Sequence, residues 1–210
     1  MKKLFILLLS AILMIGALTG CASSEELTQK VIGVWAYTTE ADEDLKRQQL
    51  ESIGMTEVEL PLLENLSFSY DLCYEFNQDG TWCYRYDTDS MRAAMNTLYS
   101  EVFDALYNNL TVLEEAYQVT FDCTREEFKQ LYAETQGLAD YTEMIYYFAE
   151  NCFDYEALGR NLAYGTYSVK GKRIILEDQI GDMDGEVEYS LEGNTLTLHF
   201  ADGVEVYTRR

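Results

Sequence analysis

The sequence is poor in the residues that most catalytic and metal sites use. Its 210 residues include one histidine, His199, and one proline, Pro61. A single histidine excludes zinc sites with several histidine ligands, Ser-His-Asp triads and Cys-His pairs. His199 stands between Leu198 and Phe200 on the polar side of an alternating segment, so we expect it at the surface. The sequence also lacks a CxxC pair, a glycine-rich phosphate loop and an EF-hand, so we expect no redox role, no cofactor and no metal.

Basic residues are scarce as well. The chain holds 15 Lys and Arg against 37 Asp and Glu, a formal net charge of −22. Without residues 1–20, which include two lysines and no acid, 13 basic residues face 37 acidic residues and the net charge is −24. Such a charge repels phosphate backbones and anionic lipid headgroups, so nucleic-acid binding is disfavoured. It is compatible with a cationic ligand, with a basic protein partner, or with solubility alone.

No stretch rich in Ser, Gly or Pro divides the chain after residue 30, and no tandem repeat is visible. The 190 residues that follow position 20 suffice for one domain, or for one domain with a substantial insertion. Hydrophobic residues make up 48% of the chain, which argues against disorder.

The N-terminus has the parts of a cleavable secretory signal. Two lysines precede an apolar run at 4–18, which is too short to cross ~30 Å of hydrocarbon as a helix. The run ends in LTGC at 18–21, which resembles the lipobox of bacterial lipoproteins. The resemblance implies cleavage before Cys21 and diacylation of its thiol, and two acyl chains give stable anchoring. We therefore expect a signal peptide at 1–20, a short tether at 21–30, and a lipid anchor on the extracytoplasmic face of a bacterial cell membrane.

Alternation of apolar and polar residues predicts a β-hairpin in the first half of the chain. The segment 67–76 alternates strictly, and the return segment 81–87 alternates again. The sequence NQDG between them supplies a turn in which Gly80 suits a positive φ. The two strands must pair in a register that keeps both aromatic rows on the same face of the hairpin. A register shift of one residue would move the side chains of one strand to the opposite face. The shared apolar face is formed by Phe68, Tyr70, Leu72, Tyr74, Phe76, Trp82, Tyr84 and Tyr86.

The last quarter of the chain predicts five further strands. Turn signals at Gly171, 181–185, 192–194 and 202–203 separate segments in which apolar residues alternate. Loops this short cannot make parallel crossovers, so the strands form an antiparallel meander. With the hairpin and an early strand at 31–39, the total is eight. Eight antiparallel strands with one apolar face suit a closed barrel or a strongly curled sheet, and with the helices the fold class is α+β.

The first and last strands carry a family resemblance. Gly33 and Trp35 open the first strand and resemble the Gly-x-Trp motif of lipocalins and their relatives. In that family a late arginine packs across the motif's tryptophan, and Arg209 ends the last strand here. The runs YEFNQDGTW, GTYSV and NTLTL resemble the lipocalin-like domains of small bacterial lipoproteins. The resemblance implies a lipocalin-like barrel, and it covers the strand-forming parts and none of the helical part.

Between residues 88 and 163 the period of the apolar residues changes from 2 to about 3.6, which predicts a helical insertion between strands 3 and 4. The insertion divides a β domain at 31–210 into 31–87 and 164–210. A single apolar stripe predicts one long helix over 91–117.

Capping residues predict the other helices. Thr124 opens a capping box that starts a second helix, and Asp140 caps a third that ends near Gly159. A shorter helix is expected at 42–53, between the first two strands. The insertion holds 14 acidic and 4 basic residues. Its helices either form a lid over the barrel mouth or pack on one another and on the outer wall as structural support.

Four cysteines follow Cys21, and the sequence leaves their state open. The pairing parity places Cys73 and Cys83 on the same polar face of the hairpin, opposite or diagonal to each other. Export permits a disulfide there and a second between Cys123 and Cys152, but four cysteines allow three connectivities. Free buried thiols are the other interpretation.

Three functions fit these observations. The first is a membrane-anchored, non-catalytic protein that binds a small apolar or amphipathic ligand, or a peptide, in a capped barrel. Its proposed ligand-binding residues, which would equally fill a closed core, are Phe68, Tyr70, Tyr74, Trp82 and Tyr84. The second is an envelope interaction or assembly protein with a solid barrel, whose acidic helical face docks a basic partner. The third is an enzyme of unrecognised type, which would need carboxylates with raised pKa values in a cleft.

Overall fold

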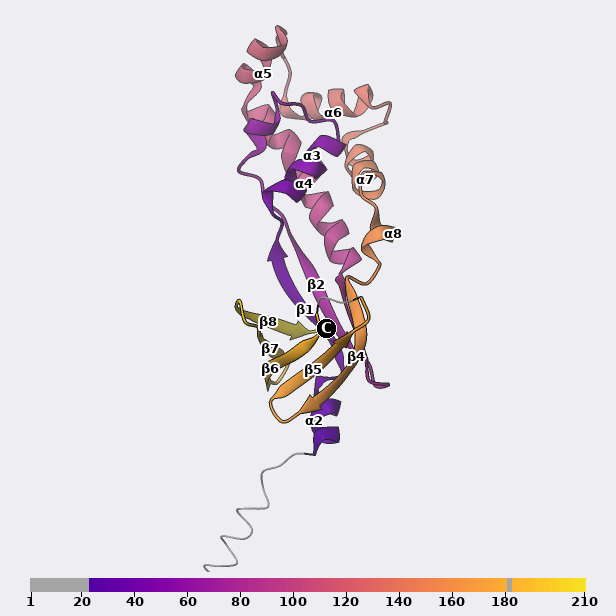
Figure 1. The fold of residues 1–210 in the computed structure, drawn as a ribbon. Coiled ribbons are helices and arrows are strands. Elements are labelled where there is room, and N and C mark those ends of the chain that lie inside the picture. Colours follow the sequence, from indigo (N-terminus) through magenta and orange to yellow (C-terminus); the bar gives the residue numbers. More distant parts are fainter. Residues whose placement is uncertain (1–22, 181–182) are drawn as a thin grey trace, which may run out of the picture.

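The eight predicted strands form a closed antiparallel barrel in chain order (Figure 1). The structure is a computed structural model that describes residues 23–180 and 183–210. Each strand pairs with its neighbours in the sequence, and the barrel closes between the first and last strands, where Trp35 lies opposite Arg209. The strands are β1 (Gly33–Glu40), β2 (Ser69–Phe76), β3 (Thr81–Tyr86), β4 (Ala163–Lys170), β5 (Arg173–Asp178), β6 (Gly185–Glu192), β7 (Thr195–His199) and β8 (Val204–Arg209).

The described residues also form seven α-helices and one 3-10 helix, so the α+β fold class is confirmed. None of these helices combines the length and the apolarity that a membrane span requires. In chain order, α4 to α8 come between β3 and β4. The helices are α2 (Ser24–Val31), α3 (Glu43–Ser52), η1 (Leu60–Leu63), α4 (Thr88–Asn108), α5 (Leu110–Tyr117), α6 (Arg125–Thr135), α7 (Tyr141–Asn151) and α8 (Tyr155–Leu158).

Side-chain caps fix where several helices begin. Thr124 and Glu127 form the expected capping box at the start of α6. Asp140 accepts a hydrogen bond from the Glu143 N–H and starts α7. Asp42 caps α3 in the same way. These three starts lie where the sequence predicts them, because the cap is a local interaction.

Two predicted helices are each divided in the structure. The long helix expected over 91–117 is interrupted at Asn109, whose φ of −118° leaves the helical region, and α5 begins at Leu110. The third helix ends at Cys152, and α8 begins after its own cap at Asp154. In both cases the apolar residues keep their helical spacing across the position where one helix ends and the next begins. The spacing alone therefore does not reveal where the helix is divided.

Residues from Ser24 onward in the predicted tether form helix α2. Ser23 caps the helix by accepting a hydrogen bond from the Glu26 N–H. The hydroxyl of Ser24 donates to the Val169 carbonyl of β4. Val31 is fully buried at the last turn. Because α2 occupies this stretch, β1 begins at Gly33 rather than at residue 31.

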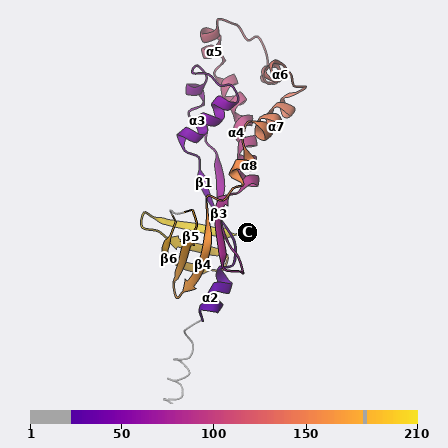
Figure 2. The same cartoon turned by 45° about the vertical axis from the view of Figure 1, so that its right-hand side comes forward.

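The molecule is elongated, with the barrel between α2 and the other helices (Figures 1 and 2). One hydrophobic core fills the barrel, and it includes Trp35, Tyr74, Phe76, Trp82, Tyr167 and Tyr207. A second core lies among the helices beyond the opposite end from α2, and we call the part of the chain around it the helical head.

The helical head draws on more of the chain than the insertion at 88–163. Leu50 of α3 and Leu63 of η1 are buried in its core beside α4. Phe68 and Tyr70, at the start of the β2 segment, belong to the same core. The segment between β1 and β2, which the sequence analysis assigned to the β domain, therefore packs with the helices.

Ion pairs join the head to the barrel. Arg210 at the chain end pairs with Asp71 of β2 and with Asp87, the N-cap of α4. The Asp87 N–H donates to the Asp71 carbonyl at 2.8 Å. The first residue of the head is thus fixed to two strands of the barrel.

Candidate functional site

The five predicted ligand-binding residues do not line one pocket. Phe68 and Tyr70 lie in the core of the helical head, whereas Tyr74, Trp82 and Tyr84 lie in the barrel core. The strand face that carries them is continuous, but the upper part of β2 extends out of the barrel and into the head (Figure 1).

Aromatic rings fill the barrel interior. The ring of Tyr74 has centroid distances of 5.7 Å to Phe76, 5.8 Å to Trp82, 4.6 Å to Tyr84 and 5.4 Å to Tyr207. Tyr74 and Trp82 are each 1% exposed. An eight-stranded barrel is just wide enough for its own side chains to fill. These side chains therefore form a packed core.

Polar groups inside the barrel are few. The Tyr207 hydroxyl donates to Oε2 of Glu205 at 2.5 Å, which places one carboxylate on the inner side of β8. Burial raises the pKa of Tyr74, Tyr84 and Tyr207 well above the usual value, so these phenols stay protonated. The Trp82 Nε1–H is buried without a hydrogen-bond partner among the described residues. These groups offer neither a nucleophile nor an ionisable acid-base pair at neutral pH.

The three predicted motif residues come together at the closure of the barrel. The Arg209 guanidinium lies over the Trp35 ring, with its central carbon 4.2 Å from the ring centroid. It donates to the carbonyls of Ile32 and Lys30 at 2.9 and 2.6 Å. Gly33 has a φ of +137°, and a Cβ there would lie 3.3 Å from the Arg209 guanidinium. The cluster thus fixes α2 to β1 and β8.

The four cysteines of the described chain are free thiols. In the hairpin register Cys73 lies opposite Arg85 and Cys83 opposite Glu75, so the two cysteines are diagonal neighbours. Burial raises the pKa of the Cys73 thiol to about 11, and it also raises those of Cys83 and Cys152. Since the thiolate is the reactive form, these thiols are poor nucleophiles at neutral pH.

The described carboxylates and thiols do not assemble a metal site. No group of three or more His, Cys, Asp or Glu side chains within residues 23–180 and 183–210 is arranged to hold an ion. His199 is exposed on β7 opposite Glu188, as its place in the sequence predicts.

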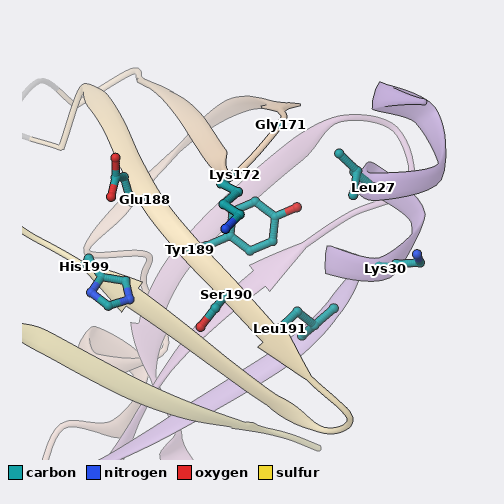
Figure 3. Close-up of a pocket in the computed structure, with 9 residues that line it drawn as sticks. All are labelled: Leu27, Lys30, Gly171, Lys172, Glu188, Tyr189, Ser190, Leu191 and His199. Carbon is teal, nitrogen blue, oxygen red and sulfur yellow. The ribbon is translucent and has the colours of Figure 1, made fainter. Parts of the chain in front are cut away.

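A cleft of about 530 Å³ lies outside the barrel, between α2, the β4–β5 turn and the end of β6 (Figure 3). The last contacts between β6 and the β4–β5 hairpin are the Arg173–Glu188 pair and the hydrogen bond from the Tyr189 N–H to the Lys172 carbonyl. After Tyr189, β6 continues to Glu192 and pairs with β7 alone. The cleft occupies the space that a longer β5 would fill.

The lining of this cleft joins apolar and basic groups. Leu27 faces it from α2, and Leu191 and the ring of Tyr189 face it from β6 (Figure 3). The Lys172 side chain extends from the β4–β5 turn toward Tyr189, and Lys30 stands at the rim on α2. This site is not expected from the sequence when 21–30 is taken as a tether, because one wall of the cleft is helix α2. The N-cap Ser23 and the i, i+4 pair Leu27 and Val31 were the available signals.

A second, more open groove follows α6 in the helical head and has a volume of about 660 Å³. Its lining is acidic, with Asp122, Glu126, Glu127 and Glu134. Leu131 in the same groove is 44% exposed. The groove combines negative charge with one apolar contact, which are the properties that a basic protein surface would recognise.

Comparisons with known proteins identify no relative. No family model matches the chain, and no curated protein or solved structure shows significant similarity to it.

Proposed function

We propose that the protein is an extracytoplasmic bacterial lipoprotein, anchored by lipid on Cys21, that binds a basic protein partner through its helical head and catalyses no reaction. Cys21 and the signal sequence lie outside the described residues. The helix α2 begins at Ser24, three residues after Cys21. Because a residue spans at most ~3.5 Å, the barrel would stand within about 10 Å of the lipid.

The filled barrel carries this proposal. Tyr74 and Trp82 occupy the space that a small apolar ligand would need, which disfavours the first of the three expected functions. Four cavities of about 280 to 660 Å³ lie at the surface, and none of the four is lined by Tyr74, Trp82 or Tyr84. The barrel is better suited to holding the head away from the membrane.

The charge of the head determines the kind of partner. Three of the four cations of the insertion are already paired: Arg92 with Glu150, and Arg125 and Lys129 both with Asp104. The acids of the α6 groove form no ion pair with any other described residue. They are therefore available to pair with the basic groups of a partner. A partner with a basic surface and an apolar anchor for Leu131 fits this groove.

We also propose a lipocalin-like architecture for the barrel. The eight-stranded meander and the stacking of Arg209 on Trp35 beside Gly33 support it. In such an architecture, α4 to α8 are an insertion between β3 and β4. The helices α3 and η1, which come between β1 and β2, pack with this insertion to form the helical head.

The anchor is tested by metabolic labelling with an alkyne analogue of palmitate in the native host. We expect label on the wild-type chain and none on Cys21→Ser, because the thiol is the site of diacylation. Cys123→Ser, which removes another cysteine of the chain, is the matched control and is expected to keep the label. Equal labelling of Cys21→Ser and wild type would contradict the anchor.

Docking is tested by cross-linking on intact cells with two charge-reversed variants. Glu126→Lys combined with Glu134→Lys changes the α6 groove by four charge units, and we expect at least a tenfold loss of the cross-linked complex (about 1.4 kcal/mol). Glu177→Lys combined with Glu192→Lys makes the same change on the exposed barrel wall and is expected to keep it. The partner, identified by mass spectrometry, should present a basic surface. Equal losses in both variants would show that net charge alone matters and would reject the groove.

A further inference from the structure

The cleft beside α2 lies at the end of the barrel where the tether would meet the membrane. The helical head stands at the opposite end (Figures 1 and 2). α2 forms one wall of the cleft through Leu27 and begins at Ser24. Any anchor at Cys21 therefore places this cleft, rather than the head, next to the lipid headgroups.

The two chain segments beside the cleft carry more basic than acidic residues. The segments 24–32 and 168–175 contain α2 and the β4–β5 turn. They hold four basic residues, Lys30, Lys170, Lys172 and Arg173, against two acidic residues, Glu25 and Glu26. The insertion at 88–163, by contrast, holds 14 acidic and 4 basic residues. These two segments thus differ in charge from the helical insertion.

Lys172 is not neutralised by an acid of the described chain. Lys170 and Lys172 form no ion pair within the described part of the chain. Lys30 pairs only with Glu26, at 3.5 Å, and both side chains are more than half exposed. Glu188, the one acid in the lining, lies 3.7 Å from Arg173. The cleft therefore keeps an uncompensated ammonium group in a protein with a net charge of −22.

We propose that this cleft binds the phosphate headgroup of an anionic phospholipid in the membrane that anchors the chain. Lys172 is the cation that meets the phosphate, and Lys30 stands at the rim (Figure 3). Leu27 and Leu191 supply an apolar contact for the first carbons of the acyl chains. This inference rests on the lipid anchor of the proposed function. Attraction at the cleft and repulsion of the acidic head together hold the molecule upright.

The experiment uses the acylated chain, purified from its own membranes and inserted into lipid nanodiscs. Lysines are acetylated with a water-soluble reagent, and the rate at each site is measured by mass spectrometry. We expect Lys172 to react about fivefold more slowly in phosphatidylglycerol discs than in phosphatidylcholine discs. Lys129, in the helical head, should react equally in both. Equal rates for Lys172 in the two lipids would overturn the proposal.

Two variants separate the cleft from general attraction to an anionic surface. Leu27→Glu adds a carboxylate to the wall of the cleft that α2 forms and is expected to restore rapid acetylation of Lys172 in phosphatidylglycerol discs. Ser168→Glu adds the same charge at an exposed position of β4 outside the lining and should leave the protection intact. Equal effects of the two variants would reject a cleft-specific site.

Two further observations complete the test. If inorganic phosphate protects Lys172 in phosphatidylcholine discs as strongly as phosphatidylglycerol does, the cleft binds free phosphate and the headgroup proposal is wrong. The mass of the purified chain reports the acyl groups before labelling begins. Missing acyl mass would contradict the proposed function, whereas an acylated chain with unprotected Lys172 would contradict this inference alone.

Discussion

Gly165→Ala is expected to lower the free energy of unfolding by about 3 kcal/mol or more, a large share of the stability of a single domain. Gly165 lies inside the barrel on β4, opposite Trp82 of β3 and Asp178 of β5. A Cβ at this position would lie well inside the van der Waals radius of the Glu177 carbonyl oxygen and 2.8 Å from its carbon. The obstacle is backbone, so no rotamer change relieves it. The pairing of β4 with β5 would have to separate.

Urea unfolding of wild type and variant measures this difference. The matched control is Gly203→Ala in the β7–β8 turn, where an added Cβ meets nothing within 4 Å. We expect that control to change the free energy of unfolding by less than about 0.5 kcal/mol. Similar stabilities for the two variants would show that β4 does not approach β5 this closely at Gly165.

The strands were predictable because their determinants are local. Alternation at 67–76 and the turn at Gly80 define the β2–β3 hairpin, and Gly80 has the positive φ that the turn requires. The register also follows from keeping the aromatic rows on one side, since Tyr74 lies opposite Tyr84 and Phe76 opposite Trp82. Each such feature depends on residues that are close in the sequence.

The division into two cores was not predictable from the same pattern. Phe68 and Tyr74 share one face of one strand, yet they lie in different cores. Alternation reports which face of a strand is apolar, but it does not report what covers that face. The covering is supplied by α4, which packs against β2, and by a core that Leu50 and Leu63 join only through the tertiary fold.

The cleft was hidden for a different reason. Its lining comes from α2, the β4–β5 turn and β6, which are far apart in the sequence. Lys172 looks like an ordinary turn residue, and Leu27 looks like part of a linker. Only the docking of α2 against β4, through Ser24 and Val169, brings these residues together.

Arg209→Ala is expected to cost about 3 kcal/mol of stability and to detach α2 from the barrel. The guanidinium donates to the carbonyls of Lys30 and Ile32 at the C-terminal end of α2, where a positive charge is favourable. Each of these two partly exposed hydrogen bonds contributes about 1 kcal/mol, and stacking on Trp35 adds about 1 kcal/mol. Urea unfolding measures the total, and hydrogen exchange of the Ile32 amide, which donates to Thr28, reports α2 locally.

Arg209→Lys separates charge from geometry. A lysine retains the positive charge but has no planar fork with which to reach two carbonyls and stack on the Trp35 ring, so we expect it to recover less than half of the loss. Full recovery would mean that the charge alone stabilises the end of α2. Because α2 supplies Leu27 and Lys30 to the cleft, Arg209→Ala should also expose Lys172 to acetylation in phosphatidylglycerol discs, at a temperature where the barrel is still folded. Loss of that protection while the barrel remains folded would show that Arg209, at the closure of the barrel, positions α2 for binding at the cleft.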